Sequence, residues 1–381
     1  MSGLPAGQPS DICCDLSAEQ EQQKAPCGCK EQRNRMSEFV REAGAAGGVA
    51  LQRDERLACH TTFRIGGPAD LLAYANTQAQ LESLMGIACS YGIPTTILGG
   101  GSNVLVSDAG VRGLVIANRT REFAISPAYS AGPMARRTLP GCDAELVADS
   151  GVMLAGLARR SIREGWSGLE WAVSVPGTVG GAIIGNAGAQ GGQIADNLLW
   201  VLASFPGEGR RVVAAEELAL SYRGSAWKRC LSAGEAIPAV LAAAFGLKRG
   251  DAHVMATRAE TYLAQRRASQ PGEPSAGSVF RNPPGDHAGR LIDAAGLKGY
   301  RVGGAAISAR HANFIVNPDR TATAADVLQL MNIMRERVYE SAGIALEAEI
   351  LFIGTWPSQP PFMHSALSCA GLGRPQLSAT S

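Results

Sequence analysis

The sequence lacks any apolar segment long enough to cross a lipid bilayer. Its longest apolar run covers residues 237–247 of the 381-residue chain, whereas a spanning helix needs roughly 20 apolar residues. The first residues also lack the basic stretch followed by an apolar core that marks a secretory signal peptide. From these absences we expect a cytoplasmic protein without a membrane partner.

An excess of charge of one sign is also missing. The chain has 35 Lys and Arg residues against 34 Asp and Glu residues, a formal net charge of +1, and no long basic run. Nucleic-acid-binding surfaces need clustered Lys and Arg to neutralise phosphates. We therefore expect no nucleic-acid partner, and any phosphate in a ligand must be held by local contacts.

The nine cysteines are scattered apart from Cys13, Cys14, Cys27 and Cys29. The spacing of these four fits no standard zinc motif, and a cytosolic chain of this size does not suggest a disulfide framework, so we expect no metal site. The four lie in a polar segment without a sustained apolar period. We predict that residues 1–36 form a disordered tail, and likewise the Pro-, Ser- and Gly-rich residues 357–381.

Between these tails, strand patterns alternate with helical ones. Residues 70–75 read as a strand, residues 79–92 carry apolar residues at helical spacing, and extended structure resumes after a glycine loop. After Pro271 the pattern changes to short strands and a long helix. We expect an α+β protein with a larger unit over residues 37–250 and a smaller α+β unit over residues 251–356.

Two glycine-dense loops lie in the predicted larger unit. The first, GGGSNV, has Val104 where the third glycine of a Rossmann motif would stand, and a strand pattern follows it instead of a helix. Its backbone N–H groups can still cradle a pyrophosphate as a nest. A tight turn explains one or two glycines more easily than three, and residues 176–192 form a second such loop. Together the loops predict a bound dinucleotide.

Ser278, in the stretch SAGSVFRNPPG, raises the question of whether it takes part in chemistry or only occupies a turn. An activated serine nucleophile needs a neighbouring base, and a G-x-S-x-G elbow would indicate one. That motif is absent here, and the nearest histidine is His287. If Ser278 is functional, it acts as something other than an activated nucleophile.

Seven blocks, in order along residues 50–354, resemble the UDP-N-acetylenolpyruvoylglucosamine reductase family. Each block is weak by itself, but seven in the same order are highly specific. They are HTTFRIGGPAD (60–70), ILGGGSNVLVSD (97–108), SVPGTVGGAIIGNAGAQGG (174–192), SYRGSAWK (221–228), SAGSVFRNP (275–283), LIDAAGLKGYRVGGAAISARHANFIVN (291–317) and LEAEILFIG (346–354).

The resemblance implies an FAD-binding domain of the vanillyl-alcohol-oxidase type over residues 37–250, followed by a substrate-binding domain. In this family NADPH reduces FAD, and UDP-N-acetylglucosamine enolpyruvate then accepts a hydride to give UDP-N-acetylmuramate for peptidoglycan synthesis. The FAD contacts that it implies are Gly99, Gly100, Gly101, Ser102, Asn103, Pro176, Gly177, Thr178, Gly180, Gly181 and Ala182.

Three catalytic residues follow from the same resemblance. Ser278 corresponds to the family's proton donor, and Arg223 corresponds to the arginine that stabilises the enol. The LEAE block offers two carboxylates, and strand alternation puts Glu347 and Glu349 on one side without choosing between them. The family's second glutamate is the catalytic one, which favours Glu349. We further hypothesise that the neighbouring carboxylates raise one pKa.

Several other residues are open to more than one interpretation. Polar contacts to FAD or substrate are expected among Asn186, Gln270 and Asn282, although the last two could equally satisfy loop backbone. The substrate diphosphate has four candidate partners, each of which could also be an ordinary surface charge: Arg281, Lys298, Arg301 and Arg310.

The sequence also departs from part of the family. It has no separate tyrosine-bearing loop between the arginine and serine blocks, and Tyr262 falls in a helical pattern. This matches the subgroup that lacks the inserted loop. Two alternatives to a reductase remain at this point, an FAD-dependent oxidase of the related class and a non-catalytic flavoprotein.

Overall fold

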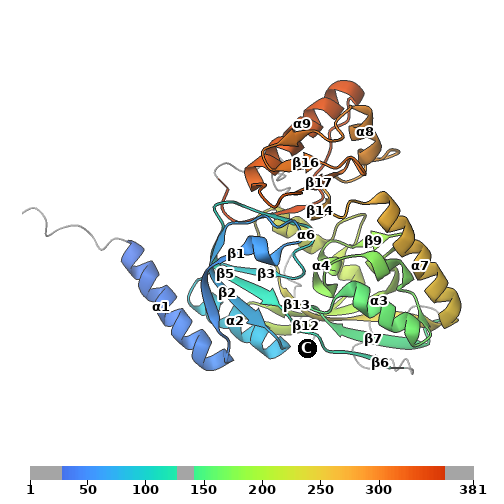
Figure 1. Cartoon of the computed structure of the whole chain (residues 1–381). Helices are drawn as coiled ribbons and strands as arrows, with labels where there is room; N and C mark the ends of the chain where they lie inside the picture. The colour runs from blue at the N-terminus through green and yellow to red at the C-terminus, as the bar shows by residue number, and fades with distance from the viewer. Residues whose placement is uncertain (1–27, 127–140, 357–381) are drawn as a thin grey trace, which may run out of the picture.

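The computed structural model describes residues 28–126 and 141–356. Helices and strands are mixed throughout this range, which confirms the expected α+β class (Figure 1). Its α-helices are α1 (Gly28–Gly47), α2 (Gln78–Ser90), α3 (Leu154–Arg163), α4 (Val179–Ile184), α5 (Ile194–Asn197), α6 (Ala226–Ser232), α7 (Ala252–Ser269), α8 (Ala288–Ala294) and α9 (Ala324–Ala342). Among them, none is both long and apolar enough to span a membrane.

The first unit is a four-stranded sheet with the order β1-β2-β5-β3. The strands are β1 (Leu51–Arg56), β2 (Pro68–Ala75), β3 (Thr95–Leu98) and β5 (Val111–Asn118). β2 and β3 both run parallel to β5, so the predicted strand at 70–75 and helix at 79–92 form a β-α-β unit around it. Helix α2 packs on this sheet through Leu81 and Leu84, and α1 adds Phe39 to the same core.

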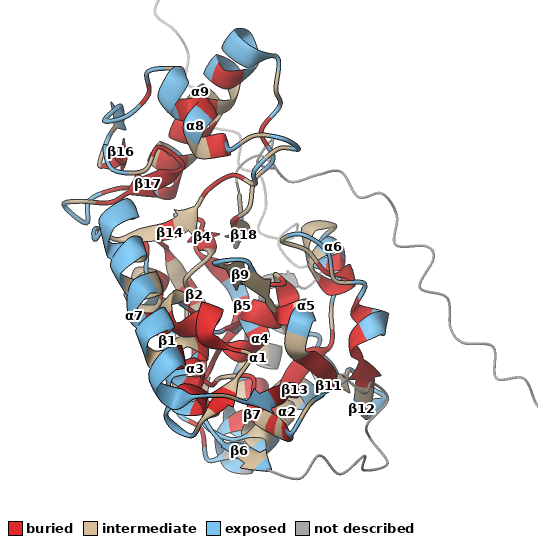
Figure 2. Ribbon diagram, turned by 90° about the vertical axis from the view of Figure 1, so that its right-hand side faces the viewer, coloured by how far each residue is buried: buried red, intermediate tan, exposed pale blue. Residues whose placement is uncertain are grey.

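The second unit is built on a larger, mainly antiparallel sheet with the order β12-β11-β13-β7-β6. Its strands are β6 (Phe123–Ser126), β7 (Ala144–Asp149), β11 (Leu198–Phe205), β12 (Gly209–Ala214) and β13 (Ala239–Arg249), with β8 (Trp166–Ser167) beside β13. Apolar residues of α3, α4 and α7 share one core with β7 and β13. Figure 2 shows that α7 turns its outer face to solvent.

The third unit contains a small sheet covered by α8 and α9. Its strand order is β14-β17-β16-β15, from β14 (Ser275–Ser278), β15 (Arg301–Val302), β16 (Ala305–Ile307) and β17 (Phe314–Val316). The last strand, β18 (Leu351–Ile353), leaves this unit and pairs in parallel with β4 (Val104–Val106) of the first unit. This return brings the residues before β18 to the end of the first glycine loop.

Three expectations can be compared with these elements. Residues 168–192, where the sequence shows little regular signal, contain a 3₁₀ helix (Glu170–Ser174), α4, β9 (Gly188–Ala189) and β10 (Gly192–Gln193). The expected boundary after residue 250 precedes α7, but Met255 and Ala259 of α7 pack in the core of the second unit. The predicted tails fall on residues 1–27 and 357–381, which lie outside the described residues, and on residues 28–36, where α1 begins.

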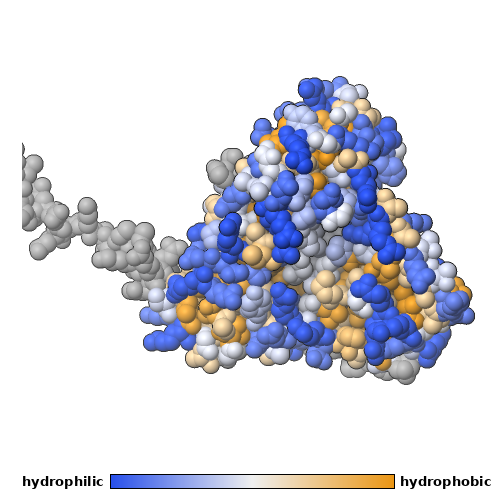
Figure 3. Space-filling model, viewed as in Figure 1, coloured by the Kyte–Doolittle hydropathy of each residue, from blue (hydrophilic) through white to orange (hydrophobic). Residues whose placement is uncertain are grey.

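The visible face of the molecule mixes blue hydrophilic side chains with smaller apolar patches (Figure 3).

Candidate active site

The two glycine-rich loops predicted to hold a dinucleotide lie directly against each other. The first follows β3, and the second leads through Thr178 into α4. A Cβ atom on Gly99 would lie 2.4 Å from Thr178 Oγ1, and one on Gly100 would lie 2.9 Å from the Cα of Gly177. The absence of side chains on these glycines is therefore what allows the loops to meet.

The first loop has the properties of an anion cradle. The N–H groups of residues 100–103 donate no hydrogen bond to any other described residue. Gly101 has φ +60°, and a Cβ there would lie 2.2 Å from the carbonyl oxygen of His60, so the loop takes a path that only glycine permits. Available N–H groups in a close-approach loop fit the pyrophosphate of FAD.

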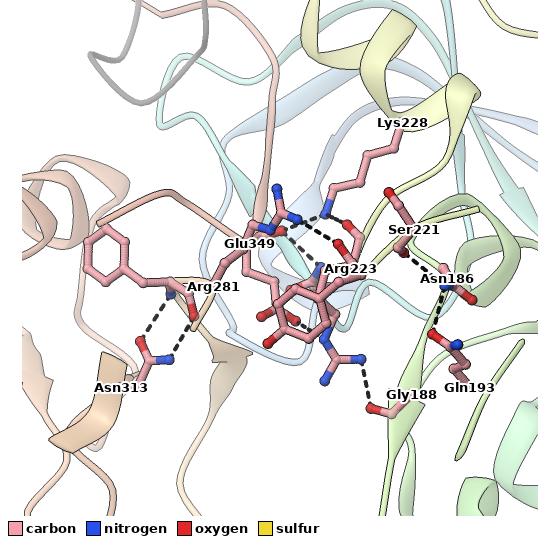
Figure 4. A network of polar contacts seen from close by, with 12 residues as sticks. Asn186, Gly188, Gln193, Ser221, Arg223, Lys228, Arg281, Asn313 and Glu349 are labelled. Atoms are coloured by element: carbon pink, nitrogen blue, oxygen red, sulfur yellow. Dashed lines mark hydrogen bonds and ion pairs between the residues drawn. The ribbon is translucent and has the colours of Figure 1, made fainter. Parts of the chain in front are cut away.

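Arg223 lies in a tight turn, where Ser221 and Gly224 form an isolated antiparallel bridge. Its backbone is left-handed, with φ +54°. The buried Asn186 holds this turn by donating from Nδ2 to the Ser221 carbonyl at 2.8 Å. The guanidinium in turn donates from Nη1 to the Gly188 carbonyl at 2.7 Å. The second glycine loop thus holds both the turn and the guanidinium of Arg223 (Figure 4).

Glu349, just before β18, faces Arg223. Arg223 Nε lies 3.0 Å from Glu349 Oε1, and the two side chains are 28% and 14% exposed. The buried Nε–H nevertheless has no hydrogen-bond partner, so the contact is an ion pair without an aligned hydrogen bond. Because the Arg223 side chain remains 28% exposed, its guanidinium can still meet a further anionic oxygen.

Burial raises the pKa of Glu349 above its ordinary value, while the positive charges of Arg223, Lys228 and Arg281 oppose this shift. The hypothesis that Glu347 raises this pKa as a neighbouring carboxylate is wrong. Glu347 is 55% exposed and instead lies 3.3 Å from Arg281 Nη1. Strand alternation would place both glutamates on one side, but both precede β18, which begins at Leu351, and their side chains have different partners.

Ser278 ends β14 at an irregularity in the sheet. Ser275 pairs with Val316 and Ser278 with Phe314, so β14 carries one residue more than β17 between these pairs. Gly277 accommodates this bulge with φ +79°. Bulges commonly redirect a side chain beside an active site. The half-buried Ser278 hydroxyl donates to no other described residue, which leaves its proton available.

Residues 279–281 run antiparallel to residues 347–349, and this pairing brings the serine and glutamate segments together. Glu349 donates its backbone N–H to Val279 O at 2.8 Å, and Arg281 donates to Glu347 O at 2.8 Å. Phe280 and Ala348 form the bridge between these two bonds. The three predicted catalytic residues therefore come from three segments that meet at one place, beside the glycine cradle.

A groove of 650 Å³ opens next to this cluster. It is lined by Tyr222, Arg281, Asn282, Pro283, Pro284, Ala345, Leu346 and Glu347. Of the four cations considered for the diphosphate, only Arg281 lines this groove. Lys298 pairs with Asp293 at 2.7 Å, and Arg301 lies 4.0 Å from Asp319. Arg310 donates to the carbonyl oxygens of Arg267 at 2.9 Å and of Gln270 at 3.2 Å.

The three polar residues with open interpretations have different surroundings. Asn186 is engaged in the turn network, because it also donates to Gln193 Oε1 and accepts from the Ala195 N–H. Asn282 accepts from the Ala288 N–H at 3.0 Å and so satisfies the start of α8. Gln270 has a buried side-chain oxygen without a partner among the described residues, which fits a ligand contact.

Lys228 was not assigned a role from the sequence, although it lies in the SYRGSAWK block. Its Nζ donates to the carbonyl oxygens of Arg223 and Glu349, both at 3.1 Å. Asn103, predicted only as an FAD contact, also donates to the Glu349 carbonyl at 3.4 Å. Contacts to main-chain carbonyls leave no pattern in the partner's side chains, so no sequence signal could have identified them.

Comparison with known proteins agrees with this architecture. Residues 69–214 match an FAD-binding domain, and residues 266–353 match the C-terminal domain of UDP-N-acetylenolpyruvoylglucosamine reductase. The chain is 41% identical over 305 residues to the enzyme of that name from Chloroflexus aggregans, with 80% of this chain and 98% of the relative covered. It is 41% identical over 308 residues to that of Rubrobacter xylanophilus, with 80% and 96% covered.

A solved structure gives the same result. The crystal structure of the UDP-N-acetylenolpyruvylglucosamine reductase from Thermus caldophilus superposes with a TM-score of 0.61 at 35% identity, covering 80% of this chain and 98% of that one. These matches include an FAD-binding domain and the C-terminal reductase domain, and they confirm the resemblance read from the seven sequence blocks. The chain belongs to the UDP-N-acetylenolpyruvoylglucosamine reductase family.

Proposed function

We propose that this protein reduces UDP-N-acetylglucosamine enolpyruvate to UDP-N-acetylmuramate with electrons from NADPH, as a step of peptidoglycan precursor synthesis. Family membership supports this reaction. The observation that carries it is the half-buried ion pair of Arg223 and Glu349, which lies beside Ser278 and next to the glycine cradle. The protein is an FAD-dependent oxidoreductase, and the cradle residues Gly99–Asn103 and Pro176–Ala182 would hold the cofactor.

When bound, reduced FAD supplies the hydride that adds to the methylene carbon of the enolpyruvyl group. As the hydride adds, the π electrons of the carbon–carbon double bond move to the adjacent carbon and its carboxylate, where negative charge accumulates. In our proposal Arg223 stabilises this enol with the exposed part of its guanidinium, and Glu349 orients the guanidinium and shares a proton with the enol. Among the described residues, three positive charges at the site, Arg223, Arg281 and Lys228, face two carboxylates, Glu347 and Glu349. The excess positive charge favours an anionic substrate.

Ser278 completes the addition by donating a proton to the carbon beside the carboxylate. A serine hydroxyl is a weak acid in water, but a carbanion next to a carboxylate is a strong base, so a positioned O–H suffices. The hydride and this proton together saturate the double bond, and the serine recovers its proton from solvent. The bulge at Gly277 and the uncommitted hydroxyl support this role.

The groove beside Arg281 is our proposed site for the nucleotide part of the substrate. Its volume of 650 Å³ lies within the range typical of small-molecule sites. The proposal assigns the cofactor to the first two units and the substrate to the third, with the boundary after α7 because this helix packs in the second core. It keeps the cytoplasmic location and the absence of nucleic-acid and membrane partners that were expected from the sequence.

An anaerobic half-reaction experiment tests the proposal. NADPH should bleach the flavin absorbance of the purified holoenzyme, and UDP-N-acetylglucosamine enolpyruvate should restore it. Ser278→Ala should still be bleached by NADPH but should be reoxidised by the nucleotide roughly 10²-fold more slowly or worse, because the proton donor is missing. If the reduced flavin of the wild type is reoxidised by oxygen but not by the enolpyruvyl nucleotide, the reductase function is contradicted and an oxidase is favoured.

A further inference from the structure

Lys228 is placed by the start of α6. Ser225 caps this helix, and its hydroxyl accepts the backbone N–H of Lys228 at 3.0 Å. Side chains in a helix lean toward its N-terminus. The lysine therefore reaches back over the turn that contains Arg223 and hydrogen-bonds the carbonyl of that residue, and across it the carbonyl of Glu349 (Figure 4).

The charge of Lys228 is unusual for a structural lysine. Within the described residues it forms no ion pair of 4.0 Å or less, and its printed partners are two neutral carbonyls. Burial lowers its pKa to about 8, with Glu349 opposing the shift and Arg281 and Arg223 adding to it. An ammonium has three N–H donors, so one remains beyond the two carbonyls. Holding two carbonyls alone would not require a half-buried positive charge, which is costly.

We propose that Lys228 is a positioning residue for the oxidative half-reaction, in which the enolpyruvyl substrate reoxidises the flavin. Its two hydrogen bonds hold the main chains of Arg223 and Glu349 at a fixed separation, and its charge stabilises the ionised form of Glu349. This inference rests on the proposed function. The structure joins the two segments through one ammonium group, since Arg223 precedes α6 and Glu349 comes from the returning end of the chain.

The charged groups around Glu349 determine what loss of Lys228 would do. Arg223 and Arg281 come from the turn before α6 and the segment after β14, and both lower the pKa of Glu349, as Lys228 does. Removal of one of the three positive charges raises that pKa further. The limb of the pH profile that reports Glu349 must then move to higher pH, whichever protonation state the reaction needs.

Three substitutions separate the charge from the hydrogen bonds. Lys228→Met removes both, Lys228→Gln keeps a donor without the charge, and Lys228→Arg keeps the charge and several donors. Lys298→Met is the matched control, because this exposed lysine pairs with Asp293 away from the groove. Each holoenzyme is reduced with NADPH under anaerobic conditions and reoxidised with the enolpyruvyl nucleotide across a pH series. Calorimetric titration of the oxidised protein with UDP-N-acetylmuramate, in buffers of different ionisation enthalpy, counts the protons taken up.

We expect the Met variant to be reduced by NADPH within about twofold of wild type and to be reoxidised roughly tenfold more slowly or worse. Its Glu349 limb should move upward by about one pH unit, equivalent to a tenfold change in proton affinity, and its proton uptake on product binding should change. Lys228→Arg should return the Glu349 limb of the pH profile to its wild-type position, whereas Lys228→Gln should not. If Met does not fold, the Gln and Arg variants still test the charge through the same comparison.

Two results would overturn the inference. One is reoxidation of the Met or Gln variant at the wild-type rate with an unchanged pH profile and proton uptake. The other is an equal slowing of both half-reactions in all three variants, which indicates a general structural defect. A wild-type enzyme that the nucleotide cannot reoxidise would instead refute the proposed function itself, so the two failures are distinguishable.

Discussion

Gly101→Ala tests whether the first glycine loop has the shape required of the cofactor cradle. The residue has φ +60°, where an alanine costs about 1–2 kcal/mol. Its Cβ would lie 2.2 Å from His60 O and 2.9 Å from the Cα of Thr61, and both are backbone atoms that cannot swing away. Overpacking of this kind typically costs about 1–3 kcal/mol. The expected loss is therefore about 2–5 kcal/mol of unfolding free energy.

The same displacement should reach the cofactor. Thr62 donates its backbone N–H to Gly101 O at 3.0 Å and its hydroxyl to the same oxygen at 3.3 Å, so a shifted residue 101 disturbs both bonds. We expect the purified variant to retain flavin at least roughly tenfold more weakly than wild type, because the N–H groups of the loop move with it. Denaturant unfolding gives the stability change, and flavin absorbance per protein with FAD titration gives the affinity.

Gly86→Ala is the control for this experiment. This glycine lies in α2 with nothing within 4 Å of a Cβ, so alanine should stabilise the helix by about 0.5–1 kcal/mol and leave flavin binding unchanged. If Gly101→Ala unfolds within about 0.5 kcal/mol of wild type and keeps its full flavin complement, the loop can adapt and the reasoning from its geometry is refuted.

Two further predictions address charged groups of the site, and a third addresses Asp108 at the start of α9. The pKa of Glu349 is raised in the folded protein, so above pH 4.5 the folded state holds a proton that the unfolded state has lost. The free energy of unfolding of the wild type should therefore fall as pH rises from 4.5 toward the raised pKa. Urea unfolding of Glu349→Gln should lack this pH dependence, and parallel curves for the two proteins would contradict the prediction. Arg281→Met should raise KM for the nucleotide about tenfold and leave the rate of flavin reduction by NADPH unchanged. An equal slowing of both half-reactions would refute a role of Arg281 in binding the nucleotide. Asp108 accepts from the N–H groups of Ala324 and Ala325 at 2.8 and 3.0 Å, so Asp108→Ala should cost about 1–2 kcal/mol in thermal or denaturant unfolding, unlike Asp319→Ala on the surface.

The sequence predicted the fold class and the local elements well where the pattern was periodic. The strand at 70–75 and the helix at 79–92 were identified because their apolar residues alternate or recur at helical spacing and are buried in one core. Helix α4 was missed, because glycines hide its apolar period and it is stabilised by burial of Val179 and Ile183. Similarly, a boundary after residue 250 places α7 with the third unit, whereas its Met255 and Ala259 pack against residues that lie earlier in the chain.

By itself the sequence determined the family, the cofactor class and the residue types of the site, because the seven blocks carry these as local patterns. It could not separate the roles of Glu347 and Glu349, since alternation places both on one side. Only the tertiary structure distinguished them: the β18–β4 pairing and the adjacent residues 279–281 put Glu349 against Arg223 and leave Glu347 exposed. Burial, the pKa of Glu349 and the link through Lys228 depend on segments distant in sequence, and such contacts exist only once the chain has folded.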